Sequence, residues 1–153
     1  VVETSNGKVR VHSKHGKTEK AENVRIASYL AEKHGYEIDL LPQEQRHQDA
    51  DTYNKTLGCK QEYKVNSTPT RGSIDSLIRK AKKQADNIVL SIESDISLET
   101  LKEAIMDRVR RSENIQSLTI VYRPTRNASP KDVTYTRDEM TMTDFKIKPE
   151  DFR

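Results

Sequence analysis

Hydrophobic and polar positions alternate along three short segments in the first half of the chain. Residues 9–12, 36–41 and 60–65 each show the period of two that is typical of a strand. Between the first two segments, apolar residues recur at helical spacing, which predicts a helix from about Thr18, its N-cap, to Lys33. The first half is therefore expected to contain strand, helix and two further strands, the last two joined through a polar loop.

The second half continues this alternation with longer apolar runs. Residues 87–92 and 115–122 are mostly apolar, as in strands that are buried on both faces. Ser73 is the expected N-cap of a helix before the first of these strands, and Ser97 that of a helix between them. After Arg123 the chain is expected to form a loop, followed by edge strands at 133–136 and 145–147.

This order predicts an α/β (α+β) fold with a central mixed β-sheet packed by about three helices. A chain of 153 residues suits a single compact domain, here 1–153, with its core over about 9–123 and a C-terminal segment, 124–153, of loop and edge strands. The hydrophobic content of 33% and the mean hydropathy of −0.90 allow a modest core beneath a heavily charged surface.

Cysteine content and hydropathy exclude several classes of protein. The single cysteine, Cys59, excludes an internal disulfide and a cysteine-rich zinc site. No apolar run approaches the roughly 20 residues that a membrane helix needs, so we expect a soluble protein without a membrane partner. The sequence begins at Val1 without an initiator methionine, which suggests either a piece of a longer protein or a chain trimmed by processing.

The distribution of charge is more informative than the net charge of +3. Between Asn54 and Lys83, two acidic residues, Glu62 and Asp75, are accompanied by eight basic ones: Lys55, Lys60, Lys64, Arg71, Arg79, Lys80, Lys82 and Lys83. Such an excess predicts a local field that attracts polyanions. The alternative is a solvated helix face without a function.

Glu62 and Lys64 are the first candidate catalytic residues. Because side chains alternate along a strand, both are expected on one displayed face, with Tyr63 turned toward the core. Two mechanisms fit them. With an earlier aspartate, Asp51 or Asp49, Glu62 would hold a metal ion. Without a metal, Lys64 would stabilise charge on a phosphate while a histidine or Glu62 moves the proton. An exposed ion pair without catalytic function is the third interpretation.

Two further sets of residues could bind a phosphodiester or take part in its cleavage. Thr70, Arg71 and Ser73 lie just before the second helix, where backbone N–H groups favour an anion, although Ser73 would also serve as a simple cap. His15, in a segment that also carries Lys14, is a candidate general acid or base.

Several motifs together resemble the CdiA C-terminal tRNA nuclease family, which belongs to the barnase, EndoU, colicin and RelE superfamily of ribonucleases. The resemblance covers roughly residues 9–123. It is carried by Glu22-Asn23-Val24-Arg25-Ile26-Ala27, Leu40-Leu41-Pro42, Ala50-Asp51, Glu62-Tyr63-Lys64, Ser73-Ile74-Asp75 and the segment from Lys83 to Leu90.

The resemblance implies a metal-independent endoribonuclease that acts on RNA, with tRNA as the expected substrate and no cofactor. Attack by a 2'-hydroxyl would leave a 2',3'-cyclic phosphate. Chemistry and resemblance together point to the catalytic candidates His15, Glu62, Lys64, Thr70 and Arg71, and to nucleic-acid contacts by Lys14, Lys60, Ser73, Arg79, Lys80 and Lys83.

The same resemblance implies a toxin domain that acts in the cytoplasm. It would be delivered as part of a larger secreted or phage-encoded protein. A cognate immunity protein would inhibit it, and this partner would be acidic where it covers the expected basic cleft around Lys64, Arg71 and the second helix.

Two alternatives remain open at this point. Asp51 with Glu62-x-Lys64 is similar to the PD-(D/E)xK nucleases, although Ala50 replaces the usual proline; this predicts a DNase that uses Mg²⁺ bound by Asp51 and Glu62. A module that binds nucleic acid or a phage head without cleaving anything is the other alternative, which the low aromatic content makes the weaker one.

Overall fold

The computed structural model describes residues 2–15, 20–42 and 50–153. Thr18 and Asp49, the predicted N-cap and one predicted metal ligand, lie outside these residues. The chain forms two compact units, Val1–Tyr63 and Lys64–Arg153, and each is described by itself. Both combine helix with a mixed β-sheet, which confirms the predicted fold class. The prediction of one domain over 1–153 stays a prediction.

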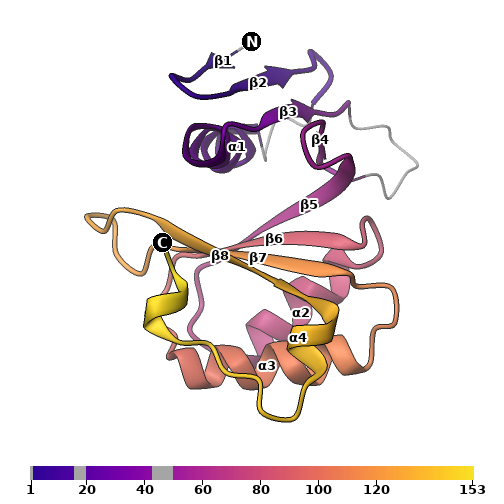
Figure 1. Ribbon diagram of the computed structural model, residues 1–153, viewed down its shortest axis with the longest axis vertical. Coiled ribbons are helices and arrows are strands. Elements are labelled where there is room, and N and C mark those ends of the chain that lie inside the picture. The colour runs from indigo at the N-terminus through magenta and orange to yellow at the C-terminus, as the bar shows by residue number, and fades with distance from the viewer. Residues whose placement is uncertain (1, 16–19, 43–49) are drawn as a thin grey trace. The chain divides into compact units, whose positions relative to one another are not determined.

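The first unit is built around a parallel strand pair joined by a helix (Figure 1). Strands β2 (Lys8–Val11) and β3 (Glu37–Leu40) pair in parallel, and α1 (Lys20–His34) connects them and packs on both. The short β1 (Val2–Glu3) pairs antiparallel with β2. Apolar residues from α1, β2 and β3 are buried at this contact: Val9, Ile26, Ala27, Leu30, Ala31, Ile38 and Leu40.

An antiparallel hairpin follows β3. Strand β4 (Thr52–Asn54) pairs with β3 and with β5 (Cys59–Asn66), which begins in the first unit and ends in the second. Gly58 closes the turn with φ 72°, a left-handed conformation that favours glycine. Residues 52–54 form β4, and residues 55–58 form this turn.

The second unit contains three further strands and most of the helices (Figure 1). Strands β6 (Asn87–Ile92) and β7 (Ser117–Tyr122) are parallel, and β8 (Lys131–Thr136) is antiparallel to β7. Helices α2 (Arg71–Ala81) and α3 (Leu98–Arg110) pack against each other over one core. The predicted strand 87–92, the Ser97 cap and the edge strand near 133–136 are confirmed.

Two predictions about the second unit are wrong. Thr70 caps α2, accepting a hydrogen bond from the Ser73 N–H, so Ser73 lies inside the helix. Residues 145–147 form no strand, although Phe145 and Ile147 are buried; they are extended chain that anchors in the core. The short α4 (Arg137–Thr141) and the 3-10 helix η1 (Pro149–Asp151) were not predicted individually; the four α-helices of the described residues agree with the expected number of about three.

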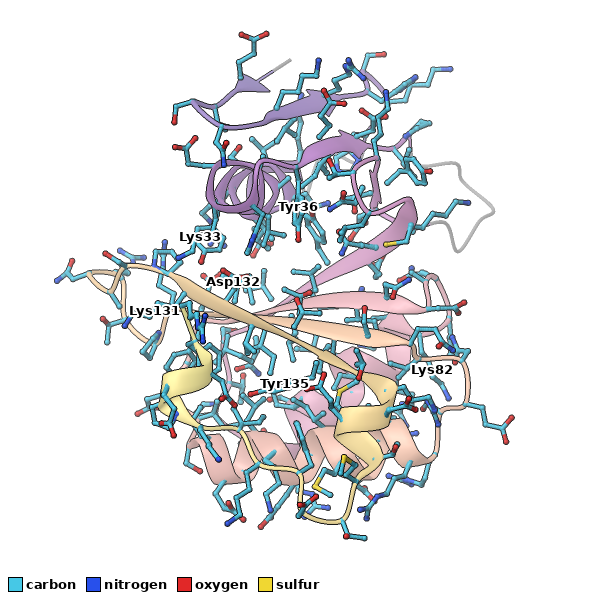
Figure 2. The ribbon with its side chains drawn as sticks, viewed as in Figure 1. Lys33, Tyr36, Lys82, Lys131, Asp132 and Tyr135 are labelled. Carbon is cyan, nitrogen blue, oxygen red and sulfur yellow. The ribbon has the colours of Figure 1, made fainter. Side chains whose placement is uncertain are left out.

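The C-terminal segment is fixed by polar contacts. Arg137 donates to the carbonyl oxygens of Ser112, Ile115 and Val109 at 2.7, 3.0 and 3.2 Å, in the last turn of α3 and just after it. Tyr135 reaches into the core from β8 (Figure 2), and its hydroxyl donates to Asp151 Oδ2 at 2.6 Å. Burial and the Asp151 carboxylate both raise the pKa of Tyr135, so the phenol stays protonated and keeps this hydrogen bond.

Candidate functional site

Two carboxylates, Asp51 and Glu62, occupy facing positions at the start of β4 and in β5. The strands pair Thr52 with Gln61, so the register continued by one residue places Asp51 opposite Glu62. The Asp51 N–H donates to Glu62 Oε1 at 2.9 Å, and the Tyr63 N–H donates to Asp51 Oδ2 at 3.2 Å. Asp51 and Glu62, called the carboxylate pair below, are therefore each held by a backbone N–H of the other strand.

Asp51 is also held from β3. The Leu41 N–H donates to the Asp51 carbonyl oxygen at 2.9 Å, which fixes the main chain of Asp51 between two strands. Asp51 is 2% exposed and Glu62 is 1% exposed. The expectation that Glu62 lies on a displayed face is therefore wrong: the successive residues Gln61, Glu62 and Tyr63 are all buried, so both faces of β5 are covered at this point. The interpretation as an exposed ion pair falls with it.

The donor set of the carboxylate pair fits a hard divalent cation. Magnesium prefers oxygen ligands and is commonly held by one or two protein carboxylates, with water and substrate phosphate completing the shell. Among the described residues, no group of three or more His, Cys, Asp or Glu side chains is placed to hold a metal ion. A site that depends on two carboxylates and the substrate is consistent with that finding.

Lys64 follows Glu62 by two positions in β5 and is the first residue of the second unit. Its side chain is partly buried. Strand alternation directs the side chains of Glu62 and Lys64 to the same side of β5.

His15 follows the last residue of β2 by four positions and is 3% exposed. Its Nδ1 is 2.6 Å from the Leu41 carbonyl oxygen, and its Nε2 is 2.9 Å from Asn23 Nδ2. Both ring nitrogens are thus engaged within the first unit. The structure brings His15 into contact with β3 and α1, and not into direct contact with either carboxylate of the pair.

The side chains of the predicted phosphate cradle bond to their own loop. Thr70 Oγ1 accepts from the Ser73 N–H, and the Ser73 hydroxyl bonds to the Thr68 and Thr70 carbonyl oxygens at 2.7 and 2.9 Å. Asn66 at the end of β5 donates to Thr68 O and to Ser73 Oγ, and accepts from Ser94. These contacts account for the conformation of the loop without a ligand.

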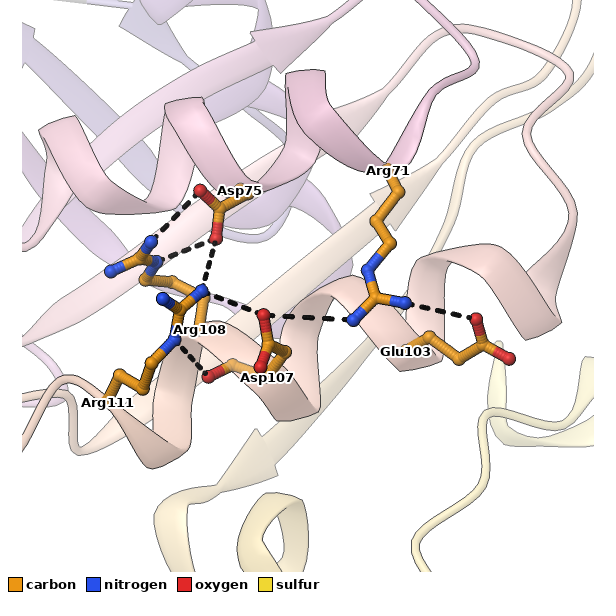
Figure 3. A network of polar contacts seen from close by, with 6 residues as sticks. All are labelled: Arg71, Asp75, Glu103, Asp107, Arg108 and Arg111. Atoms are coloured by element: carbon orange, nitrogen blue, oxygen red, sulfur yellow. Dashed lines mark hydrogen bonds and ion pairs between the residues drawn. The ribbon is translucent and has the colours of Figure 1, made fainter.

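Arg71 belongs to a network of charges between α2 and α3 (Figure 3). Its guanidinium lies 3.5 Å from Glu103 and 3.7 Å from Asp107. In the same network Arg108 makes two hydrogen bonds to Asp75, at 2.7 and 3.0 Å. Arg71 is thus paired with acidic side chains, a partner choice that the sequence did not reveal.

The predicted nucleic-acid contacts are mostly exposed. Lys14 and Lys60 are exposed in the first unit; Arg79, Lys80 and Lys83 are exposed at the end of α2 and just after it in the second unit. The structure brings the last three together on one helix end, where they also complement the helix dipole.

Sequence reasoning missed two contributors to this region, Asn23 and the backbone of Leu41. Asn23 is 3% exposed on the buried side of α1, and it lies four residues before Ala27 and seven before Leu30. A polar residue in an apolar stripe was the signal that could have found it. No sequence signal marks a backbone group such as the Leu41 N–H.

A hollow of about 700 Å³ lies in the second unit, between β8 and the C-terminal segment. Tyr135, Met142, Phe145, Lys146 and Arg153 are among its lining residues. None of the predicted site residues lines it, so it does not bear on the chemistry predicted from the sequence.

Comparisons with protein-family models, with curated proteins and with solved structures find no match to this chain. Within the described ranges, no helix has the length and apolar character needed to cross a membrane.

Proposed function

We propose that this chain is a divalent-cation-dependent nuclease that cleaves RNA, with the cation held by Asp51 and Glu62. The observation that carries the proposal is the carboxylate pair: two buried acids at facing strand positions, each held by a backbone N–H of the other strand. The RNA substrate is the part that rests on the resemblance to tRNA nucleases.

The burial of the pair supports a cationic partner. Two carboxylates in neighbouring buried positions repel each other, and removing each of them from water is costly unless positive charge or hydrogen bonds compensate. The backbone hydrogen bonds from the Asp51 and Tyr63 N–H groups contribute to offsetting that cost. A divalent cation between them would offset more of the cost of burying two negative charges. It would also give the pair a function in binding, beyond any role in folding.

In the proposed mechanism the residues of this chain bind, orient and stabilise. When bound, Mg²⁺ supplies Lewis-acid chemistry: it neutralises charge on the phosphate and favours ionisation of an attacking water. Asp51 and Glu62 keep fixed orientations through their backbone hydrogen bonds. The Lys64 ammonium stabilises negative charge that develops on the phosphate. In the second unit, taken by itself, the exposed Arg79, Lys80 and Lys83 are suited to attract an RNA backbone.

The metal-independent mechanism has less support. It needs a proton acceptor near Lys64, and both ring nitrogens of His15 are engaged by Asn23 and Leu41. It also assigns charge stabilisation to Arg71, whose guanidinium is paired with Glu103 and Asp107. Glu62 is the remaining candidate base for that route.

Incubation with total tRNA in Mg²⁺, in EDTA, and in EDTA followed by excess Mg²⁺ tests the proposal. We expect cleavage in Mg²⁺, none in EDTA and recovery on adding the metal back. Lys64→Ala is expected to slow cleavage, whereas Lys131→Ala, at an exposed lysine of β8, serves as the control that does not. A duplex DNA in parallel reports whether the substrate is RNA.

Two results would contradict the proposal. Cleavage that persists in EDTA would favour the metal-independent ribonuclease. Binding of tRNA that weakens steeply with salt, without cleavage in any of the metal conditions, would favour a nucleic-acid-binding module.

A further inference from the structure

The buried ring of His15 connects three elements of the first unit. Its Nε2 is 2.9 Å from Asn23 Nδ2 on α1, and its Nδ1 is 2.6 Å from the carbonyl oxygen of Leu41 at the end of β3. A carbonyl can only accept, so Nδ1 carries the proton and donates to it. Nε2 then accepts from the Asn23 amide.

The Leu41 main chain continues this connection to the carboxylate pair. While its carbonyl accepts from His15, its N–H donates to the Asp51 carbonyl oxygen at 2.9 Å. The Asp51 N–H in turn donates to Glu62 Oε1. These hydrogen bonds link α1, through the ring and the main chains of Leu41 and Asp51, to the Glu62 carboxylate.

The loop that carries His15 is itself fixed to β3. The His12 N–H donates to the Leu40 carbonyl oxygen at 3.0 Å, and the His15 N–H donates to the His12 carbonyl oxygen at 2.9 Å. The ring is thus held at the end of β3, beside the residue, Leu41, whose N–H bonds to the Asp51 carbonyl oxygen. Displacing the ring would release the Leu41 carbonyl and loosen the strand end that holds Asp51.

We propose that His15 is a positioning residue for the carboxylate pair, acting through the Leu41 main chain so that Asp51 and Glu62 are pre-arranged to bind a divalent cation. This inference rests on the proposed function, and it assigns His15 no contact with RNA. Partners one step removed from a metal ligand commonly alter metal affinity 10–100-fold when they are changed, because they fix the ligand's orientation.

The test compares His15→Ala, His15→Asn and His12→Ala in the full chain. Alanine removes both ring contacts. Asparagine places an Nδ2–H near the position of the ring Nδ1–H and so keeps a donor for the Leu41 carbonyl. His12 is an exposed histidine of the same loop and serves as the matched control. Mn²⁺ binding is followed by the electron paramagnetic resonance signal of the unbound ion, and exchange of the Asp51 amide proton by NMR.

We expect His15→Ala to weaken Mn²⁺ binding about tenfold and to speed exchange of the Asp51 amide, and His15→Asn to recover most of the affinity. The KM for tRNA at saturating metal should not change. His12→Ala should match the unmodified chain in every measurement. If His15→Ala does not fold, Asn23→Ala takes its place, since it removes the other partner of the ring and should weaken Mn²⁺ binding in the same direction.

Unchanged Mn²⁺ affinity in folded His15→Ala or Asn23→Ala overturns the inference. Asp51→Asn separates this failure from that of the proposed function. If Asp51→Asn loses Mn²⁺ while His15→Ala keeps it, the carboxylate pair binds metal without help from His15. If the unmodified chain binds no Mn²⁺, the inference and the proposed function both fail.

Discussion

Glu62→Gln is expected to lower kcat for tRNA cleavage by roughly 10²–10³-fold while the protein stays folded. A bound cation contributes several kcal/mol of transition-state stabilisation, and each 1.36 kcal/mol is about tenfold in rate. The glutamine side chain has the shape of glutamate and keeps an oxygen for the Asp51 N–H, so the strand contact survives. It lacks the charge that holds the cation. Single-turnover cleavage of labelled tRNA measures the loss.

Glu37→Gln is the matched control for this change. Glu37 is an acidic residue of β3 in the same unit, with a side chain that is 44% exposed and paired with Lys8 at 3.2 Å. Its replacement should leave cleavage within about twofold, because exposed ion pairs contribute little. Cleavage by Glu62→Gln at a rate close to that of the unmodified chain would remove Glu62 from the chemistry and with it the proposed site.

Arg108→Ala is expected to lower the free energy of unfolding of the second unit by about 2–3 kcal/mol. Arg108 makes two hydrogen bonds to Asp75, joining α3 to α2, and its side chain is only 10% exposed (Figure 3). Hydrogen bonds to charged groups contribute about 1.5–3 kcal/mol, and the substitution leaves the Asp75 carboxylate without its main partner. Urea unfolding followed by circular dichroism measures the change.

Arg71→Ala is the control within the same network. Its guanidinium is about half exposed and lies 3.5–3.7 Å from its acidic partners, so its loss should cost below about 1 kcal/mol. Equal losses for the two variants would show that burial and bidentate geometry do not set the strength of these pairs.

The loss in Arg108→Ala should also depend on pH. Arg108 beside Asp75 holds the pKa of that carboxyl below its ordinary value, because the guanidinium stabilises the charged form. The stabilisation is therefore fully present above about pH 4, the pKa of an aspartate in the unfolded chain, and is lost as the pH falls through the lower folded value. The difference between Arg108→Ala and the unmodified chain should shrink below that pH.

Elements with a strong apolar pattern could be predicted from the sequence. Residues 87–92 form β6 with the predicted bounds, because a continuous apolar run bounded by polar residues has few alternatives. The N-cap of α2 was misplaced because Thr70 and Ser73 both carry a hydroxyl, and only the backbone geometry decides between them. The five-residue α4 is too short for a helical period to be visible.

The candidate site was harder to predict, because its geometry depends on register and on contacts between distant residues. Asp51 faces Glu62 only because the turn at Gly58 sets the pairing of β4 with β5. His15 bonds to Leu41, 26 residues away, a contact that no local pattern encodes. The pairing of Arg71 with Asp107 likewise requires α3 to lie beside α2.

A crystal of the protein soaked in Mn²⁺, with data collected at a wavelength where manganese scatters anomalously, tests the central claim most directly. The account predicts an anomalous peak bonded to carboxylate oxygens of both Asp51 and Glu62. Clear density for both acids with no manganese peak between them, or with the ion bound at another place only, would contradict it.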